Sequence, residues 1–394
     1  MAALPLPIST YTLTTALGRG RAANAAALAV GQGGLSIEPF ETCTLPCWTG
    51  PVAGLEAPLS GELKIWDCRN NRLAELGLQQ DGFMAAVTSL AARYGAHRVG
   101  VFVGTSTAGV QHTELAYRAR NRETNTLPTW FDYRTSQSTF SVAHYVQLRL
   151  GLSGVAVAIA TACSSSAKVF ASAARAIAAG HCDAAVVGGV DSLCLTTLYG
   201  FNALQLVSPE PCRPSDATRA GISIGEAAGF AILDPASNAA HALLGYGESS
   251  DAHHMSAPEP EGRGAAEAMR AALERGACEA SAVDYIHLHG TATPANDLAE
   301  DKAVNSVFGN AAPRSSSKGF FGHTLGAAGV VGAAVALIAM EQGLMPASLN
   351  TRVVDEAIRG NILLAPQLGR VRRVMSNAFG FGGNNCSLLI GARP

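Results

Sequence analysis

The segment formed by residues 156–168 constrains the fold most strongly, because it predicts a buried strand that leads directly into a helix. Its first half is a short apolar run of Val, Ile and Ala, and its second half opens with the small and hydroxyl residues that typically begin a helix. Cys163 lies at the junction, where unpaired N–H groups and the helix dipole favour negative charge. We therefore expect a lowered pKa and a reactive thiolate at Cys163, although a cysteine is more commonly an ordinary buried residue.

The composition excludes several classes of protein. Charged residues make up 15% of the 394 residues and the net charge is −2, so no nucleic-acid or membrane-surface partner is expected. The nine cysteines include no C-x-x-C pair, which argues against a disulfide framework or a structural zinc site and indicates a cytoplasmic location. Residues 1–6 lack the pattern of a signal peptide. The apolar run 326–340 is too short and glycine-rich for a membrane span and predicts a packed core helix.

The order of predicted elements indicates an α/β protein with two similar halves. The continuous apolar run 184–190 predicts a parallel strand that is covered on both faces. Residues 73–94 have the spacing of a helix. A change to a Pro-, Ser- and His-rich composition at 234–262 marks a boundary. We therefore expect two α/β halves, formed by residues 1–234 and 235–394.

Two histidine motifs follow predicted strands in the second half. His289 ends an apolar strand just before a glycine and two threonines, whereas His287 lies within that strand. Lys318 and His323 flank a glycine-containing turn that precedes a helix of small residues. Alone, each histidine would more often be structural and the lysine a solvated charge. In company with Cys163 they indicate a reactive site.

A third motif, residues 377–385, combines closely spaced glycines with two phenylalanines and predicts a flexible turn without the features of a phosphate loop. One cysteine and two histidines leave three chemistries open: a cysteine hydrolase, a metal site or a carbon–carbon condensing site. A hydrolase usually orients one histidine with Asn or Asp, and the separate turns do not suggest a metal-ligand set. Two histidines suit the enolate that forms when a malonyl thioester loses carbon dioxide.

The chain resembles the elongating β-ketoacyl-acyl-carrier-protein synthases, which have a Cys-His-His site, in four motifs: residues 161–166, 289–293, 318–329 and 377–385. The resemblance covers most of the chain from about residue 99 onward. It implies a thiolase-like fold, which is a duplicated five-layer αβαβα sandwich. It also implies an acyltransferase that has no metal and no cofactor of its own, because phosphopantetheine is carried on its substrate, the acyl carrier protein. The partner would be a second copy or, in a heterodimer, a chain-length subunit.

The resemblance also implies a role for each site residue. Cys163 would accept the acyl chain, and His289 and His323 would promote decarboxylation and stabilise the enolate. Lys318 would organise the electrostatics of the site. Phe381 would gate it, and the N–H groups of Phe381 and Cys163 would form an oxyanion hole. The implied substrate-binding residues are Thr291, Thr293, Phe379 and Gly382, of which the threonines would bond the phosphopantetheine arm.

One position departs from the family pattern. Gly332 stands where relatives commonly have Glu, nine residues after the second histidine, and this puts a monovalent-cation site in doubt. Asp297 and Glu300 are expected to cap the helix that follows them rather than to replace that Glu. Lys168 is expected to point away from the site, because five residues is not a same-face helical spacing.

Two other functions stay open, namely a non-catalytic chain-length subunit of the same fold and a cysteine thioesterase or hydrolase. The pathway is also open between housekeeping fatty-acid elongation and polyketide-like synthesis, such as that of an aryl polyene. The segments 104–109 and 196–206 are expected to line the acyl pocket. Charge suggests three residues for carrier docking: Lys64, Arg69 and Arg72.

Overall fold

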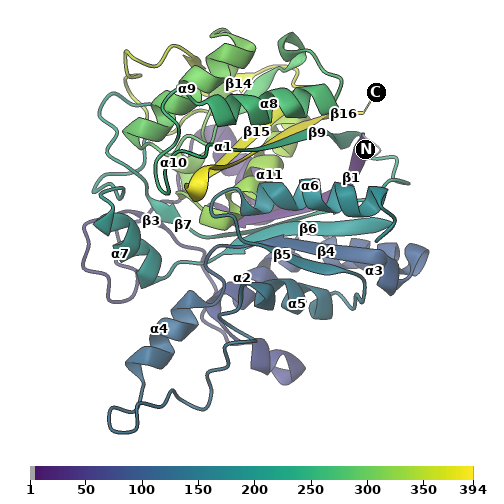
Figure 1. Cartoon of the computed structure of the whole chain (residues 1–394), viewed down its shortest axis with the longest axis vertical. Helices are drawn as coiled ribbons and strands as arrows, with labels where there is room; N and C mark the ends of the chain where they lie inside the picture. The colour runs from purple at the N-terminus through teal and green to yellow at the C-terminus, as the bar shows by residue number, and fades with distance from the viewer. Residues whose placement is uncertain (1–4, 394) are drawn as a thin grey trace.

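A computed structural model describes residues 5–393, in which helices and sheets alternate in five layers (Figure 1). Both sheets are covered on both faces, so the predicted αβαβα arrangement is confirmed. Residues 1–4, on which the signal-peptide expectation partly rests, lie outside the described residues.

The first sheet belongs to the N-terminal half. In spatial order its strands are β1 (Leu6–Thr15), β8 (Ala227–Leu233), β6 (Ala184–Asp191), β4 (Val99–Gly104) and β5 (Ala156–Ile159), so that β5 lies at the edge. The pairs β1–β8 and β8–β6 are antiparallel, and the pairs β6–β4 and β4–β5 are parallel. Every residue of β6 is buried, as its continuous apolar run predicts.

The second sheet repeats the order and directions of the first. Its strands are β9 (His241–Ser250), β16 (Asn384–Ala392), β15 (Arg373–Gly380), β10 (Tyr285–His287), β11 (Pro313–Ser315) and the edge strand β13 (Asn361–Ile362). The pairs β9–β16 and β16–β15 are antiparallel, and the pairs β15–β10 and β10–β11 are parallel. β1 also pairs with β9, which joins the two sheets. The architecture is therefore duplicated, although no repeat is visible in the residues themselves.

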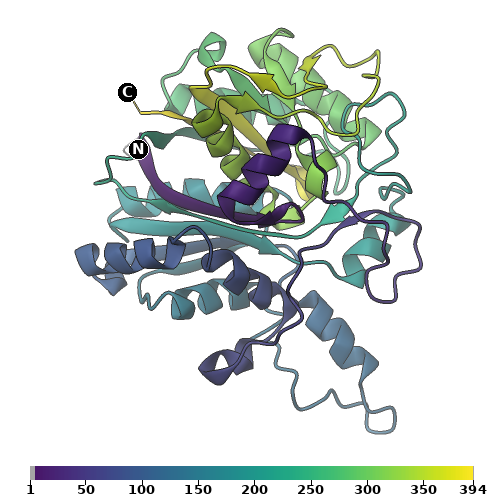
Figure 2. The same cartoon turned by 180° about the vertical axis from the view of Figure 1, so that it is seen from behind.

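The helices form three layers around the sheets (Figures 1 and 2). The middle layer is α1 (Gly20–Val30), α6 (Ser165–Ala178) and α11 (Ala328–Gln342), whose apolar residues share one core between the sheets. The outer face of the first sheet is covered by α2 (Arg69–Leu78), α3 (Phe83–Tyr94) and α5 (Thr139–Arg149). The outer face of the second is covered by α8 (Arg263–Arg275) and α9 (Pro294–Phe308).

Helix α11 is the packed core helix that the run 326–340 predicts. Together with the turn before it, α11 forms the stretch Leu325–Gln342, which is long and apolar enough to cross a membrane by composition alone, but 83% of that window is buried inside the protein. A helix that is apolar all round needs such a central position.

One expectation about the elements is wrong. The helix predicted over 73–94 is two helices, because Asp81 and Gly82 both adopt positive φ and end α2 before α3 begins. The segment 234–262 also contains the ten-residue strand β9, which the sequence pattern did not predict. Its glycines hide the strand pattern and are needed for packing, since a β-carbon at Gly245 would lie 2.0 Å from the carbonyl oxygen of Ala272 in α8.

The remaining elements lie mainly at the ends of the sheets. α4 (Val110–Arg118) and the segment that follows it project from the body of the molecule (Figure 1). The elements that lie near the site are α7 (Leu195–Ala203), β7 (Ile224–Gly225) with its partner β3 (Thr49–Gly50), and α10 (Lys318–Phe321).

Candidate active site

Cys163 lies in a tight turn between β5 and α6, as the sequence predicts. Ala162 adopts a φ of 51°, in the left-handed region that disfavours a β-carbon. The hydroxyl of Ser165 stabilises this turn, because it accepts the N–H of Thr161 at 2.9 Å and donates to the carbonyl of Ala162. The Cys163 side chain is buried against the opposite half of the protein, so the turn presents the sulfur to residues from the second sheet.

The predicted lowering of the Cys163 pKa is wrong. Burial raises the pKa of the thiol from 9.0 to about 11, while the charge of Lys318 and the N–H groups of Phe381 and Cys163 act in the opposite direction. The loss of water around the sulfur therefore outweighs the helix N-terminus. At neutral pH the unacylated side chain of Cys163 is therefore mainly in the thiol form.

His323 is hydrogen-bonded to Cys163. Its Nε2 lies 3.0 Å from Sγ of Cys163, and its Nδ1 accepts the N–H of Leu325 at 3.2 Å. A neutral imidazole has one donor and one acceptor nitrogen, so this arrangement assigns the proton to Nε2. Burial and the charge of Lys318 hold the pKa of His323 well below its usual range, which keeps the ring neutral.

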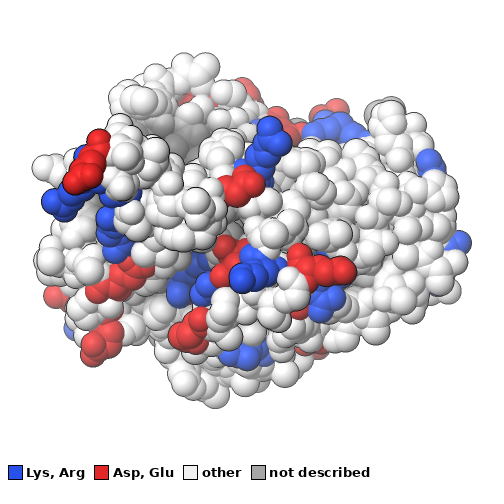
Figure 3. Space-filling view, turned by 90° about the horizontal axis from the view of Figure 1, so that it is seen from below, with Lys and Arg blue, Asp and Glu red and all other residues white. Residues whose placement is uncertain are grey.

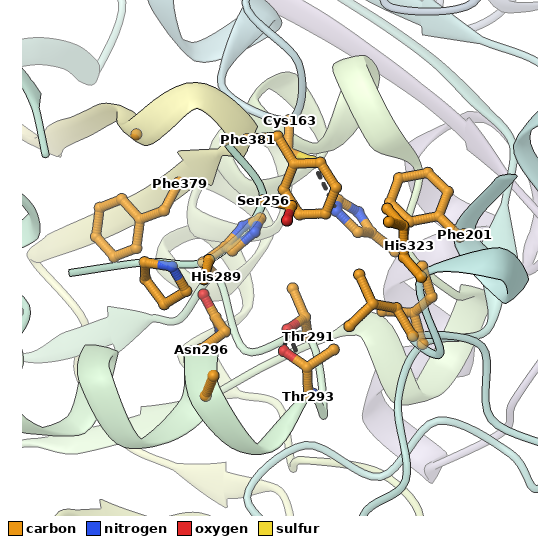
Figure 4. A pocket seen from close by; sticks show the side chains of 18 of the residues that line it. Cys163, Phe201, Ser256, His289, Thr291, Thr293, Asn296, His323, Phe379 and Phe381 are labelled. Atoms are coloured by element: carbon orange, nitrogen blue, oxygen red, sulfur yellow. Dashed lines mark hydrogen bonds between the residues drawn. The ribbon is translucent and has the colours of Figure 1, made fainter. Parts of the chain in front are cut away.

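The proton of the His289 ring also lies on Nε2, but other contacts place it there. The Lys318 ammonium donates to the backbone carbonyl of His289 and lies 3.4 Å from its Nδ1, which leaves Nε2 as the N–H donor. Its ring is 5.2 Å from that of His323, and burial followed by the charge of Lys318 keeps the pKa of His289 well below 6.5. Two neutral imidazoles therefore direct N–H donors to the space beside one sulfur (Figure 4).

The loop that carries His289 is held by acidic residues of α9. Glu300 accepts the N–H groups of His289 and Gly290, each at 2.7 Å. Asp297 accepts the N–H groups of Ala292 and Ser215. Asp297 lies in the first turn of α9, as expected for a residue that caps the helix. However, both carboxylates mainly hold the loop that carries His289, and helix capping alone did not predict this contact.

The glycine-rich loop packs directly on the nucleophile turn. A β-carbon at Gly380 would lie 2.7 Å from the carbonyl oxygen of Thr161 and 3.1 Å from the nitrogen of Cys163. The N–H groups of Phe381 and Cys163 both interact with the thiol, so this close approach brings the two predicted oxyanion donors together. The Phe381 ring faces Phe201 of α7 at 5.5 Å.

A cavity of about 370 Å³ leads to Cys163. Thr291, Thr293 and Phe379 line it, and the two threonine hydroxyls are 2.8 Å apart (Figure 4). Gly382 is not in the wall, because its N–H bonds the carbonyl of Met255 and its positive φ turns the loop. Of the predicted pocket segments, 196–206 contributes Phe201, Leu204 and Leu206, whereas 104–109 does not line this cavity.

The donor set does not fit a metal ion. One possible ligand atom from each of Cys163, His289 and His323 lies within 4.8 Å of the others. However, each Nδ1 accepts a hydrogen bond, which places the remaining proton on the Nε2 that faces the sulfur. The buried Lys318 ammonium beside His289 would also repel a cation.

Asp191 is the residue that sequence reasoning missed most clearly. Its carboxylate is fully buried at the end of β6 and accepts bonds from residues 105–107, where the first half approaches the site. It also accepts the N–H of Gly326, three residues after His323, at 2.6 Å. An aspartate after a buried strand carries no signal for this contact, since its partners lie 85 and 135 residues away.

The charged residues near the site have other partners. Lys168 lies 4.0 Å from Glu248 and so points away from Cys163, as expected. Arg69 forms an ion pair with the buried Glu226, and Arg72 pairs with Asp67, so each guanidinium already has a carboxylate partner within this chain. Figure 3 shows cations and anions interspersed on the lower face, without a field of one sign.

Comparisons with known proteins agree with this geometry. Residues 77–239 match the β-ketoacyl synthase N-terminal domain and residues 241–352 the C-terminal domain. The 3-oxoacyl-[acyl-carrier-protein] synthase 2 of Rhizobium meliloti (strain 1021) is 35% identical over 313 residues, covering 74% of this chain and 73% of the relative. That of Vibrio cholerae serotype O1 is 30% identical over 398 residues, covering 92% and 93%.

A solved complex of a ketosynthase (ApeO) with its chain length factor (ApeC) from Xenorhabdus doucetiae contains a chain that is 35% identical to this one. The TM-score is 0.89, and each chain is covered completely. The chain therefore belongs to the β-ketoacyl synthase family. Its fold is thiolase-like, as predicted, and it is an acyltransferase.

Proposed function

We propose that this chain catalyses a decarboxylative Claisen condensation between an acyl group on Cys163 and a malonyl group on an acyl carrier protein. The observation that carries this proposal is the pair of neutral imidazoles beside the sulfur, with Nε2 of His323 at 3.0 Å from Sγ. Neutral donors suit an enolate, because they stabilise its charge without first protonating its carbon.

The first half-reaction loads the enzyme. The small thiolate fraction of Cys163 attacks the thioester of the acyl carrier, and the acyl group moves from the carrier sulfur to Sγ. The proton of the Cys163 thiol ends on the released phosphopantetheine thiol. During the transfer the N–H groups of Phe381 and Cys163 stabilise the oxyanion, and Thr291 and Thr293 bond the arm. The enzyme supplies no cofactor, since the phosphopantetheine arrives on the carrier.

The second half-reaction extends the chain. The malonyl carrier loses carbon dioxide, and the electron pair of the broken C–C bond forms an enolate whose oxygen accepts the Nε2–H bonds of His289 and His323. The enolate carbon then attacks the acyl carbonyl on Cys163. The C–S bond breaks, and Cys163 leaves as a thiolate that regains a proton. Burial keeps both imidazoles neutral, and the charge of Lys318 lowers their pKa values further.

We assign the reaction to a polyketide-like pathway in the cytoplasm that extends an unsaturated, aryl-polyene-type chain. The cavity wall contains the aromatic rings of Phe201, Phe379 and Phe381, which favour flat conjugated chains through stacking. The full-length likeness to a chain from a ketosynthase–chain length factor complex also supports a specialised role.

We also propose that a chain-length subunit binds the edge of the first sheet. β5 is an apolar edge strand, and such an edge pairs readily with another chain. Phe140 and Leu148 of α5 and Trp130 and Tyr133 of the projecting segment are exposed large hydrophobic residues. Co-expression with a candidate subunit and sizing of the complex test this, and a Phe140→Glu variant is expected to release the subunit.

One experiment tests the chemistry. The enzyme is incubated with malonyl carrier and a panel of acyl carriers, saturated and polyunsaturated or aryl, and the products are identified by mass. We expect carbon dioxide release, acylated Cys163 and extension of the unsaturated starters. If saturated starters are extended equally well, the proposed polyketide-like pathway is wrong, but the proposed condensation reaction still holds.

Two outcomes would replace the reaction itself. Hydrolysis of acyl carrier without malonyl carrier would indicate a thioesterase. If none of the starters acylates Cys163, the chain is better explained as a non-catalytic chain-length subunit.

A further inference from the structure

His287 is a buried histidine to which the proposed reaction assigns no role. It ends β10 and is 4% exposed. In the parallel pairing of β10 with β15 it lies opposite Ser376, so the two side chains share one face of the sheet. Both lie against α11 at Gly332, which is the position that departs from the family pattern.

The glycine at 332 and the imidazole at 287 fit each other. A β-carbon at Gly332 would lie 2.6 Å from Oγ of Ser376 and 3.0 Å from Nδ1 of His287. These distances leave no room for a methyl group, and still less for a glutamate. The imidazole of His287 and the hydroxyl of Ser376 occupy the space that a side chain at position 332 of α11 would need. The local packing therefore favours glycine at this position.

The hydrogen bonds of His287 fix its proton. Nε2 lies 2.8 Å from Oγ of Ser317, and within residues 5–393 Nδ1 has no partner. Burial and the charge of Lys318 lower the pKa of His287 to about 3, so the ring is neutral. A buried N–H without an acceptor is rarely tolerated, whereas a lone pair is left unpaired more often. The proton therefore sits on Nε2 and is donated to Ser317.

Ser317 links His287 to the catalytic lysine. It directly precedes α10, and its carbonyl accepts the N–H of Phe320 at 2.9 Å, which starts the helix. Lys318 is the next residue, and its ammonium bonds the backbone carbonyl of His289 and lies 3.4 Å from Nδ1 of that ring. A shift of Ser317 would move Lys318 away from both contacts.

We propose that His287 is a positioning residue that acts through Ser317 to hold Lys318 against His289, and that Gly332 admits its ring. This inference rests on the proposed function for the roles of Lys318 and His289. It explains the departure at Gly332 by the space that the His287 ring needs, without any direct contact between His287 and substrate.

Two variants that carry the same amide group and differ by one methylene separate the bond to Ser317 from the other contacts of His287. In His287→Gln the longer side chain can place an amide near the former Nε2 and keep the bond to Ser317. In His287→Asn the amide is too short to reach. We expect His287→Asn to slow malonyl-carrier decarboxylation at least tenfold and to slow acylation of Cys163 by a smaller factor, through the reduced thiolate fraction, and His287→Gln to stay within about threefold of wild type. Ser317→Ala should reproduce the Asn variant, and the double variant should be no slower than either single one.

Two results would overturn the inference. In one, the Gln and Asn variants are equally slow. In the other, the loss of decarboxylation follows the loss of Tm and affects both half-reactions alike. A second readout does not depend on condensation, namely the pH dependence of Cys163 alkylation by iodoacetamide. Since the charge of Lys318 lowers the thiol pKa, displacement of Lys318 in His287→Asn should move this profile to higher pH, and His287→Gln should not. If wild type does not decarboxylate malonyl carrier but the alkylation profiles differ in this way, the proposed function fails and the positioning role stands.

Discussion

Asp191 at the end of β6 accepts the backbone N–H of Gly326 at 2.6 Å and so fixes the turn that orients His323. Leu325, which donates to Nδ1 of His323, adopts a φ of 49° in this turn. Asp191→Asn replaces one acceptor oxygen with a donor that faces other donors. We expect a loss of about 2–4 kcal/mol in the free energy of unfolding, because a buried network loses a charged partner. Condensation should fall at least tenfold, measured on the folded fraction.

The matched control is Asp183→Asn. Asp183 forms an ion pair with Arg98 at 2.7 Å, but its side chain is 42% exposed and the pair is screened by water, so the loss should be much smaller than for Asp191→Asn. Urea unfolding measures both variants. Equal losses in the two variants would show that Asp191 does not hold the turn.

The close approach of Gly380 to the nucleophile turn gives a second prediction. In Gly380→Ala the new methyl group would meet the carbonyl of Thr161 at 2.7 Å, which forces the Phe381 loop and the Cys163 turn apart. The oxyanion donors then separate, and acylation of Cys163 should slow about 10²-fold, as for the loss of one oxyanion donor. Gly200→Ala in α7 is the control, because nothing lies within 4 Å of its β-carbon, and acylation should be unchanged. If acylation is unchanged in Gly380→Ala, the N–H group of Phe381 does not stabilise the oxyanion.

The raised pKa of Cys163 predicts how the free enzyme reacts with iodoacetamide. Only the thiolate reacts, and burial raises the pKa from 9.0 to about 11, so the rate at Cys163 should keep rising about tenfold per pH unit from pH 7 to 10. An unperturbed thiol would level off near pH 9. Lys318→Met should shift the profile to still higher pH, because the lysine charge lowers this pKa. Mass spectrometry locates the label, and a plateau below pH 9 would contradict the prediction.

The sequence was most informative where neighbouring residues decide the structure. The junction at 156–168 places Cys163 between β5 and α6, and the apolar run 326–340 is the buried helix α11. His289 and His323 follow short apolar or small-residue patterns, and the fold brings their rings to 5.2 Å. These elements could be predicted because each has a local period or cap signal.

The remaining features depend on distant contacts. The pKa of Cys163 rises because the second half of the chain excludes water from the sulfur, and no local pattern reports this exclusion. β9 was hidden because the glycines that let it pack on α8 interrupt its alternation. Gly332 looked like a lost functional residue, and only the position of the His287 ring explains it. Such effects follow from packing between the halves.

Glu300 provides the last prediction, which concerns stability and pH. Burial raises its pKa from 4.5 to about 7, while the N–H groups of Gly290 and His289 act in the opposite direction. The folded protein therefore holds a proton that the unfolded chain releases above about pH 4.5. The stabilisation is complete below that pH and is lost as pH rises toward 7, by at most about 1.4 kcal/mol per pH unit for one proton. Glu300→Gln cannot titrate, so the stability of wild type relative to this variant should decrease between pH 5 and 7 and become constant above pH 8.

The matched control has the opposite shift. The hydrogen bonds that Asp216 accepts from Arg352, Thr218 and Val353 outweigh its burial and lower its pKa to about 2. Its stabilisation is present above about pH 4 and is lost only below it, so the stability of wild type relative to Asp216→Asn should not change between pH 5 and 8. Urea unfolding at each pH measures both differences. A constant difference for Glu300→Gln over pH 5–8 would mean that Glu300 is already ionised at pH 5, and that its bonds to His289 and Gly290 prevail over burial.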